Sequence, residues 1–240
     1  MSTRPTSTPT SRASRPALSA GAAAIVLAMA GAVGACTQAQ ASIRLPAPAV
    51  DAPASAAPQT AVLAGGCFWG VQGVFEHVRG VKQVVAGYAG GKRATADYET
   101  VSTGTTGHAE SVQITFDPKQ ISYGEILRIF FSVGTDPTQV NRQFPDTGTQ
   151  YRSEVFYTNA DQKMVADRYI AQLNRAKVFA RPIATRVDPN PGFFRAEAYH
   201  QDYLVRHPDA PYIATFDAPK IAALKTLFPA NYRAAPVTAL

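Results

Sequence analysis

The spacing of apolar side chains switches along the chain between the two-residue repeat of a strand and the 3.6-residue repeat of a helix, and this order limits the possible folds. The clearest strand signal is the strict alternation over residues 109–116, which Asp117-Pro118 ends. The clearest helix signals are a long apolar stripe over 159–179 and the capping box that Ser122 opens. Strands are predicted at 60–66, 81–88, 109–116, 150–157 and 182–187, and helices at 71–78, 122–133 and 159–179, with two short helices within 193–228.

The order is strand, helix, two strands, helix, strand, and then mostly helix. It predicts the α+β class, as a ferredoxin-like α/β roll with a mixed sheet and helices on one face. A long, partly irregular C-terminal tail follows. The order and register of the strands stay open at this point.

The first 41 residues have the composition of an export signal. Three arginines and no acidic residue precede an apolar, Ala- and Gly-rich run over 17–35. An uncleaved membrane anchor is the alternative, because the run approaches the length of a membrane span. Cleavage would follow either a lipoprotein-type box, which leaves Cys36 lipidated, or the small-residue site Ala39-Gln40-Ala41. The chain is therefore expected to be periplasmic or a membrane-anchored bacterial lipoprotein.

The rest of the chain divides into residues 42–58, a Pro- and Ala-rich stretch expected to be a flexible or partly extended linker, and residues 59–240, one catalytic domain. We expect a monomer. Without the three arginines of the signal, the formal charge falls from +6 to +3, so the charge does not indicate a nucleic-acid partner. The sequence contains no zinc-type Cys/His spacing and no phosphate loop, so neither a metal nor a bound cofactor is expected.

Cys67 lies where the first strand ends and the first helix begins. The unpaired N–H groups and the dipole at the start of a helix lower the pKa of a thiol, and the thiolate is the nucleophilic form. Cys67 is also the only thiol of the mature chain if Cys36 is removed or lipidated. The alternative is an inert, buried structural cysteine.

Glu110 shares a face of its predicted strand with Val112, Ile114 and Phe116. A carboxyl group on the core-facing side of a strand loses its hydration, which raises its pKa and keeps it protonated. A neutral, buried glutamic acid is a competent general acid. The alternative is an ion pair between Glu110 and a nearby arginine.

Trp69 and His108 each allow two interpretations. Trp69 falls outside the apolar stripe of its helix, which favours a pocket wall over a place in the core. His108 either shapes the turn before Glu110 or acts as the base for Cys67. In the second case Cys67, His108 and Asp146 would form the triad of a cysteine hydrolase or acyl transferase.

Six ordered segments, together with Pro219-Lys220 and Leu227-Phe228-Pro229 near the end, resemble the A-type methionine sulfoxide reductases, and the similarity spans about residues 60–229. The most specific are GCFWG at 66–70 and GTTGHAE at 104–110. The others are GYAGG at 87–91, DPTQ with NRQ at 136–143, DTGTQYRS at 146–153 and AEAYHQDY at 196–203.

The resemblance implies an enzyme that reduces the S epimer of free or protein-bound methionine sulfoxide through a sulfenic acid on the catalytic cysteine. Its substrates would be oxidised proteins and peptides. It further implies these roles: Cys67 as nucleophile, Glu110 as the acid that protonates the sulfoxide oxygen, Tyr98 and Tyr151 as hydrogen-bond donors to that oxygen, Phe68 and Trp69 as the wall around the methyl group, and Asp146 as an organiser of the site.

The chain departs from the family at three points. No cysteine follows Cys67, although many relatives carry resolving cysteines near the C-terminus, so a thioredoxin-like external thiol is expected to regenerate the enzyme. Thr135 stands where His is common, and Phe144 where Gly is common. Phe144 is expected to narrow the mouth of the pocket or to change which oxidised peptides fit. A non-catalytic lipoprotein that retains the fold is a further alternative.

Overall fold

A computed structural model describes residues 42–53 and 55–240, and its centre is a six-stranded sheet in the order β7-β6-β1-β3-β2-β8. All neighbours pair antiparallel except β6 and β7, so the sheet is mixed, as predicted. The inner order β6-β1-β3-β2 is that of a ferredoxin-like fold. The strands are β1 Gln59–Gly65, β2 Val81–Ala89, β3 Ala109–Phe116, β6 Ser153–Tyr157, β7 Arg186–Pro189 and β8 Phe193–Arg195, with a separate hairpin of β4 Arg142–Gln143 and β5 Asp146–Thr147.

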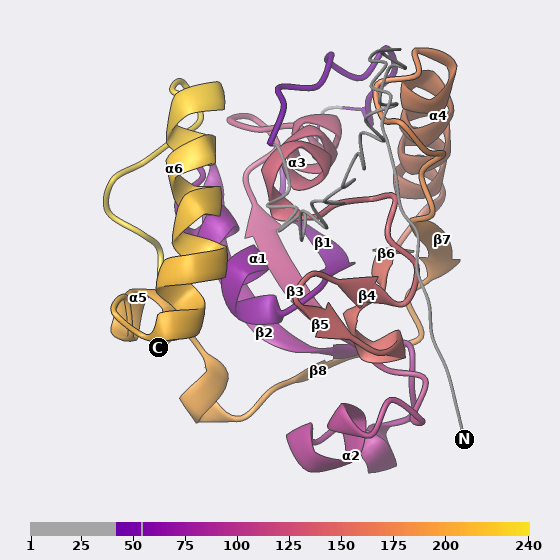
Figure 1. The fold of residues 1–240 in the computed structure, drawn as a ribbon. Helices are drawn as coiled ribbons and strands as arrows, with labels where there is room; N and C mark the ends of the chain where they lie inside the picture. The colour runs from indigo at the N-terminus through magenta and orange to yellow at the C-terminus, as the bar shows by residue number, and fades with distance from the viewer. Residues whose placement is uncertain (1–41, 54) are drawn as a thin grey trace, which may run out of the picture. The chain divides into compact units, whose positions relative to one another are not determined.

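Two helices connect the inner strands: α1 (Phe68–Glu76) joins β1 to β2, and α3 (Tyr123–Ile129), which continues into a π-helical turn over Phe130–Gly134, lies between β3 and β6. Figure 1 shows α4 and α6 at opposite sides of the view with α1 and α3 between them, and α2 at the lower end. The remaining helices are α2 Tyr98–Ser102, α4 Ala160–Arg175, α5 Tyr203–Arg206 and α6 Ala218–Leu227.

Alternation along the strands divides the core between the two faces of the sheet. In β1, Ala61 and Leu63 belong to the main core, which α1, α3 and α4 cover, whereas Val62 and Ala64 face a smaller apolar cluster. In β3, Glu110 is opposite Tyr88 of β2, and its side chain is buried as the alternation predicts. The strand that carries the acid therefore lies beside the strand that leads to Cys67.

The Pro- and Ala-rich stretch before β1 contacts the domain at several points where the structure describes it. Leu45 is buried, and its N–H donates to Ser132 Oγ at 3.2 Å. Gln172 of α4 binds the backbone on both sides of Pro48, and Asp51 accepts hydrogen bonds at the start of α3. These contacts fasten the stretch to the domain, and composition alone does not reveal them.

The structure corrects several element boundaries. The strand predicted at 182–187 begins only at Arg186, because the preceding residues connect it to α4. The helix predicted to reach residue 179 ends at Arg175, and Lys177 then adopts a left-handed φ of 50°. The strand predicted to start at residue 150 begins at Ser153, because Thr149–Tyr151 form a 3₁₀ turn. Neither β8 nor α2 was predicted, because both are too short to show a repeat.

The predicted export signal, Cys36 and both cleavage sites lie outside the described residues. Within residues 42–53 and 55–240, no helix combines the length and apolar character needed to cross a membrane.

Candidate active site

Cys67 lies at the junction between β1 and α1 and is the N-cap residue of α1. The preceding Gly66 has a φ of +93°, and a Cβ there would lie 2.5 Å from the side chain of Gln143. Only glycine allows this turn and this close approach. The start of α1 therefore lies at the sulfur, where the backbone N–H of Trp69 acts to lower the pKa of the thiol, although the Cys67 side chain makes no capping hydrogen bond.

Glu110 lies against the same junction. Its side chain is 3 % exposed, and Oε2 accepts a 3.0 Å hydrogen bond from the N–H of Phe68, the residue after Cys67. Burial raises the pKa of Glu110 to about 8, although the Phe68 N–H opposes that rise. The carboxyl group is therefore protonated at neutral pH.

The pKa of Cys67 is raised, whereas a lowered value was predicted from its place at a helix start. Burial is the largest cause, and the carboxylates of Glu110, Asp217 and Asp146 add to it. The N–H of Trp69 acts in the opposite direction but does not offset them. The resting sulfur is therefore a thiol, and its proton has to leave during the reaction.

Tyr98 and Tyr151 come from separate elements, and both lie close enough to Glu110 and Cys67 for those charges to act on them. Tyr98 opens α2, whose N-terminus Asp97 caps, and Tyr151 ends the 3₁₀ turn before β6. Burial and the charges of Glu110 and Cys67 raise the pKa of both phenols. Both therefore remain protonated hydrogen-bond donors beside the acid and the thiol.

The C-terminal tail fixes the aromatic side chains that follow Cys67. Trp69 donates from Nε1 to His200 Nδ1 at 3.1 Å and stacks on Tyr203, with ring centroids 3.8 Å apart. The Phe68 ring centroid lies 5.0 Å from that of His200. Burial lowers the pKa of His200, so the imidazole is neutral and able to accept from the indole. Trp69 is thus partly buried against the main core and is held in place by residues from outside α1.

Asp146 accepts a hydrogen bond from the Tyr212 hydroxyl, and burial raises its pKa. A further acid, Asp217, is fully buried and bonded to Lys220 at 3.1 Å. This pair lies against Gly70 in the first turn of α1. Three carboxyl groups and one ammonium group therefore surround the region of the thiol.

The hydrolase triad is not assembled. His108 is buried, its Nδ1 accepts from the Gly91 N–H at 3.2 Å, and its Nε2 donates to the Lys92 carbonyl at 3.0 Å. Both ring nitrogens are thus used by the turn after β2, and none is left to take a proton from Cys67. Asp146 bonds to Tyr212 instead of His108. His108 therefore holds the turn after β2, in agreement with its interpretation as a turn-shaping residue and not as a base for Cys67.

Glu110 has no ion pair among the salt bridges of the described residues. Arg152 forms an ion pair with Glu154 at 2.5 Å and donates hydrogen bonds to the carbonyls of Gly107 and His108. The arginine alternative for Glu110 is therefore wrong, and Arg152 instead holds the turn that leads into β3.

Thr135 has a structural role at the position where relatives commonly have His. Its hydroxyl accepts from Gln143 Nε2 at 2.7 Å, and Gln143 Oε1 accepts from the Asp136 N–H at 3.0 Å. Gln143 is the side chain that packs on Gly66, so Thr135 fastens the loop that carries Asp146 to the turn before the nucleophile.

Several residues that position the site were not predicted from the sequence. Glu197 accepts from the Tyr98 N–H and from the Tyr88 hydroxyl, both at 2.9 Å, and so places α2 over the site. The AEAYHQDY segment at 196–203 contains Glu197, His200 and Tyr203 but carried no assigned role, and Tyr212 and Asp217 lie beyond it. The other such residues, all from the tail, are His200, Tyr203, Tyr212 and Asp217.

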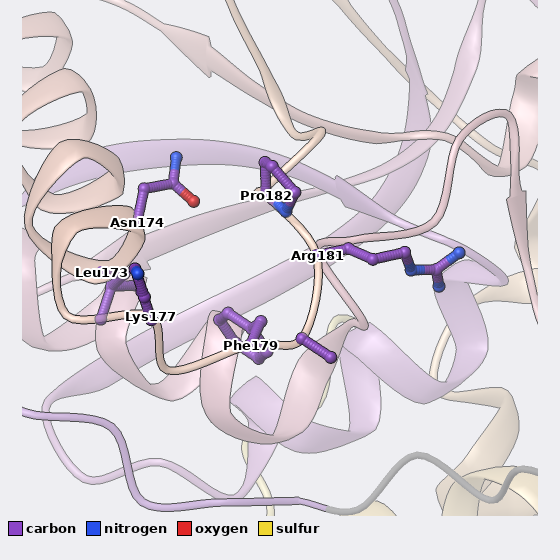
Figure 2. Close-up of a pocket in the computed structure, with 7 residues that line it drawn as sticks. Leu173, Asn174, Lys177, Phe179, Arg181 and Pro182 are labelled. Carbon is purple, nitrogen blue, oxygen red and sulfur yellow. The ribbon is translucent and has the colours of Figure 1, made fainter.

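A solvent-open cavity of about 600 Å³ lies at the end of α4 and shares no residue with this site. Figure 2 shows its lining side chains around the loop that follows the helix. Among the described residues, no group of His, Cys, Asp and Glu side chains could hold a metal ion.

The comparisons with known proteins agree on one family. Residues 59–231 match the family model "Peptide methionine sulfoxide reductase". The chain is 53% identical over 191 residues to peptide methionine sulfoxide reductase MsrA 2 of Mesorhizobium japonicum, covering 80% of this chain and 98% of the relative. It is 56% identical over 163 residues to MsrA 2 of Synechocystis, covering 68% and 76%. Among solved structures, reduced Mxr1 of Saccharomyces cerevisiae is similar, with a TM-score of 0.57, 33% identity and coverage of 64% and 87%.

Proposed function

The chain belongs to the peptide methionine sulfoxide reductase family, and from this we propose that it reduces the S epimer of methionine sulfoxide, free or within polypeptides, to methionine. The observation that carries the proposal is the hydrogen bond from the Phe68 N–H to Glu110. It holds a protonated acid one residue from the Cys67 thiol.

The reaction needs a nucleophile and an acid at once. Sulfoxide sulfur is electrophilic, but its oxygen is a poor leaving group unless it is protonated. The Cys67 sulfur attacks while Glu110 protonates the oxygen, which passes to Cys67. Cys67 is oxidised by two electrons to a sulfenic acid, and the sulfoxide is reduced by two electrons to the thioether. Glu110 regains a proton from the thiol, so no net proton is consumed.

Substrate selection follows from the two sides of the site. Tyr98 and Tyr151 supply hydrogen-bond donors beside Glu110 for the oxygen, and Phe68 and Trp69 supply an apolar wall for the S-methyl group. A sulfoxide sulfur is chiral, so one donor side and one apolar side accept a single epimer. These roles follow the family resemblance, and the shared placement of the side chains supports them.

Regeneration requires a thiol from outside, because the whole sequence has only two cysteines, Cys36 and Cys67. A thioredoxin-like dithiol would attack the sulfenic sulfur, release water and form a mixed disulfide. Its second thiol then restores Cys67. No bound cofactor takes part in this cycle.

We propose that the chain is exported and that this chemistry takes place outside the cytoplasm. The basic segment and the apolar run over 17–35 support export, with either lipidation at Cys36 or ordinary cleavage near residue 41. Incorporation of labelled palmitate into the wild type but not into Cys36→Ser would identify the lipoprotein route. A released, unlabelled mature chain would identify the other.

The proposed activity is tested by reduction of free and peptide-bound methionine S-sulfoxide with dithiothreitol as the thiol. The wild type is expected to turn over both, Cys67→Ser neither, and Thr147→Ala, an exposed change outside the site, both at the wild-type rate. A wild type without sulfoxide reductase activity, or an active Cys67→Ser variant, contradicts the proposal.

A further inference from the structure

A chain of aromatic contacts leads from the nucleophile to the protein surface. Trp69 meets the edge of Tyr212 with ring centroids 5.9 Å apart. Tyr212 lies 5.1 Å from Phe216, and Phe216 meets Phe144 edge to face at 5.8 Å. Rings at these distances attract one another, so the four side chains form a continuous aromatic path.

The outer end of this path is unusually apolar for a solvent-facing surface. Phe144 is 41% exposed, and Val140 of the same loop, at 66%, is the most exposed large hydrophobic side chain among the described residues. Phe216, which packs against Phe144, is half-buried. We call Val140, Phe144 and Phe216 the outer apolar surface. Single exposed apolar residues are common, but a group continuous with an active site indicates binding.

The loop that presents this surface is fixed. The Phe144 N–H donates to Gln139 Oε1 at 3.1 Å, and Gln139 Nε2 donates to Asp136 Oδ2 at 3.0 Å. Gln143 anchors the same loop to Thr135. Little side-chain or loop ordering is therefore required when a ligand binds, which favours affinity.

Building on the proposed function, we propose that the outer apolar surface binds apolar side chains next to the oxidised methionine of an unfolded polypeptide. The occupant is fixed by continuity with the site: a methionine sulfoxide seated at Trp69 leaves its neighbours in the chain along the aromatic path. Unfolding exposes the apolar side chains that a native protein buries, so a methionine sulfoxide in an unfolded segment has apolar side chains within reach of this surface. Free methionine sulfoxide has no such neighbours and gains nothing from this surface.

The test compares three substrates, reduced with dithiothreitol: a blocked pentapeptide with leucines on both sides of methionine S-sulfoxide, the same peptide with glycines, and free methionine S-sulfoxide. The wild type is expected to have the highest kcat/KM for the leucine peptide. Phe144→Ala should lower the ratio of kcat/KM between the leucine and glycine peptides by about tenfold, since a lost apolar contact of this size has about that effect. Val140→Ala should lower the same ratio by a smaller factor.

Two further variants make the outcome decisive. Phe144→Leu keeps an apolar side chain and should restore most of the ratio, while Thr147→Ala, exposed on the same hairpin, should behave as the wild type. An unchanged ratio in both Phe144→Ala and Val140→Ala overturns the inference. So does an equal loss with all three substrates, which would place Phe144 in the support of the reacting groups. A wild type that reduces none of the three overturns the proposed function and this inference with it.

Discussion

Burial decides the protonation states of single residues in this site. It raises the pKa of Glu110 to about 8 and that of Cys67 above its usual value, so acid and nucleophile both carry a proton at neutral pH. For the acid this is the state that the reaction needs. For the nucleophile the proton has to be transferred, and the Glu110 carboxylate formed during the reaction is its natural acceptor.

The first prediction concerns Glu110. Glu110→Gln removes the transferable proton and should lower kcat/KM by about 10²–10⁴-fold. In the wild type, activity should fall as pH rises through about 8, because Glu110 loses its proton there. The residual activity of Glu110→Gln should not show this fall with rising pH. Glu99→Gln, a change at an exposed carboxylate, serves as the control, and a wild-type pH profile in Glu110→Gln would exclude Glu110 as the acid.

Glu76 gives a second prediction, for stability. Its side chain is fully buried in α1, and burial together with the neighbouring Asp202 raises its pKa from 4.5 to about 9. The folded state holds the Glu76 proton more tightly than the unfolded state does. The contribution of this protonation to the free energy of unfolding is therefore fully present below pH 4.5 and is lost as pH rises through about 9. Stability should fall over this window by at most about 1.4 kcal/mol per pH unit from this residue.

Urea unfolding at pH 5, 7 and 8.5 measures this effect. The Glu76→Gln variant cannot ionise, so its free energy of unfolding should change less with pH than that of the wild type. Parallel pH dependences in the two proteins would show that Glu76 does not titrate as described.

The positions of Cys67 and Glu110, at a strand-to-helix junction and on the buried side of a strand, could be predicted from the sequence because their signals are local. His200, Tyr203 and Tyr212 could not be assigned, because 131 residues separate Trp69 from His200 and no periodicity links them. The direction of the Cys67 pKa was predicted wrongly for a related reason. A helix start is visible in sequence, whereas the burial that mainly raises the pKa, and the charges of Glu110 and Asp217 that add to it, depend on the tertiary fold.

At the scale of elements, α1 depends on two glycines for different reasons. A Cβ on Gly70 would lie 2.0 Å from Asp217 Oδ1 and 2.9 Å from Lys220 Nζ. A Cβ on Gly73 would instead meet the flexible end of Leu204 at 2.7 Å. The Asp217–Lys220 ion pair beside Gly70 cannot move without breaking its own bond. The Leu204 side chain beside Gly73 can adjust.

The third prediction compares these two positions. Alanine favours a helix over glycine by about 1 kcal/mol, so both substitutions start with the same advantage. Gly73→Ala should be close to neutral, whereas Gly70→Ala should destabilise by about 1–3 kcal/mol through overpacking. Thermal unfolding of the two variants measures the difference. Equal melting temperatures would mean that the Asp217–Lys220 pair is not fixed against α1.

A fourth prediction concerns the extended stretch before β1. Leu45 is 1% exposed in the main core, so Leu45→Ala should lower the free energy of unfolding by about 2–5 kcal/mol. Ile43→Ala, at 38% exposure two residues earlier, is the matched control and should cost less than about 1 kcal/mol. Chemical denaturation of both variants distinguishes a docked stretch from a free linker, for which the two costs would be alike.

The sheet was largely predictable from sequence, and the tail was not. The strands β1, β2 and β3 follow from apolar runs and alternation, and the helix order then favours the ferredoxin-like arrangement. Short elements such as β8 owe their existence to pairing with β2, a tertiary contact with no local pattern. The stretch at Leu45 was missed because its composition is that of a linker.

At the scale of the whole molecule, Cys67 is the only cysteine among the described residues, and none follows it in the sequence. We expect one turnover without a reductant to leave the mature chain heavier by one oxygen atom on Cys67, with no intramolecular disulfide. Mass spectrometry of the intact protein and of its Cys67 peptide measures this. Dimedone, which labels sulfenic acids, should react with the wild type after turnover and not with the resting protein. An internal disulfide in the mature chain would rule out the one-thiol cycle.

The partners of Trp69 and Tyr98 come from residues 197–212, far downstream of Cys67. A ribosome therefore delivers the reactive sulfur long before it delivers the ring that holds the indole in place. While the chain is being synthesised, the Cys67 sulfur is present before the residues that hold Trp69 and Tyr98 in place. Repair competence begins only when the downstream segment docks, so a nascent or truncated chain is itself exposed to the oxidants whose damage the finished enzyme reverses.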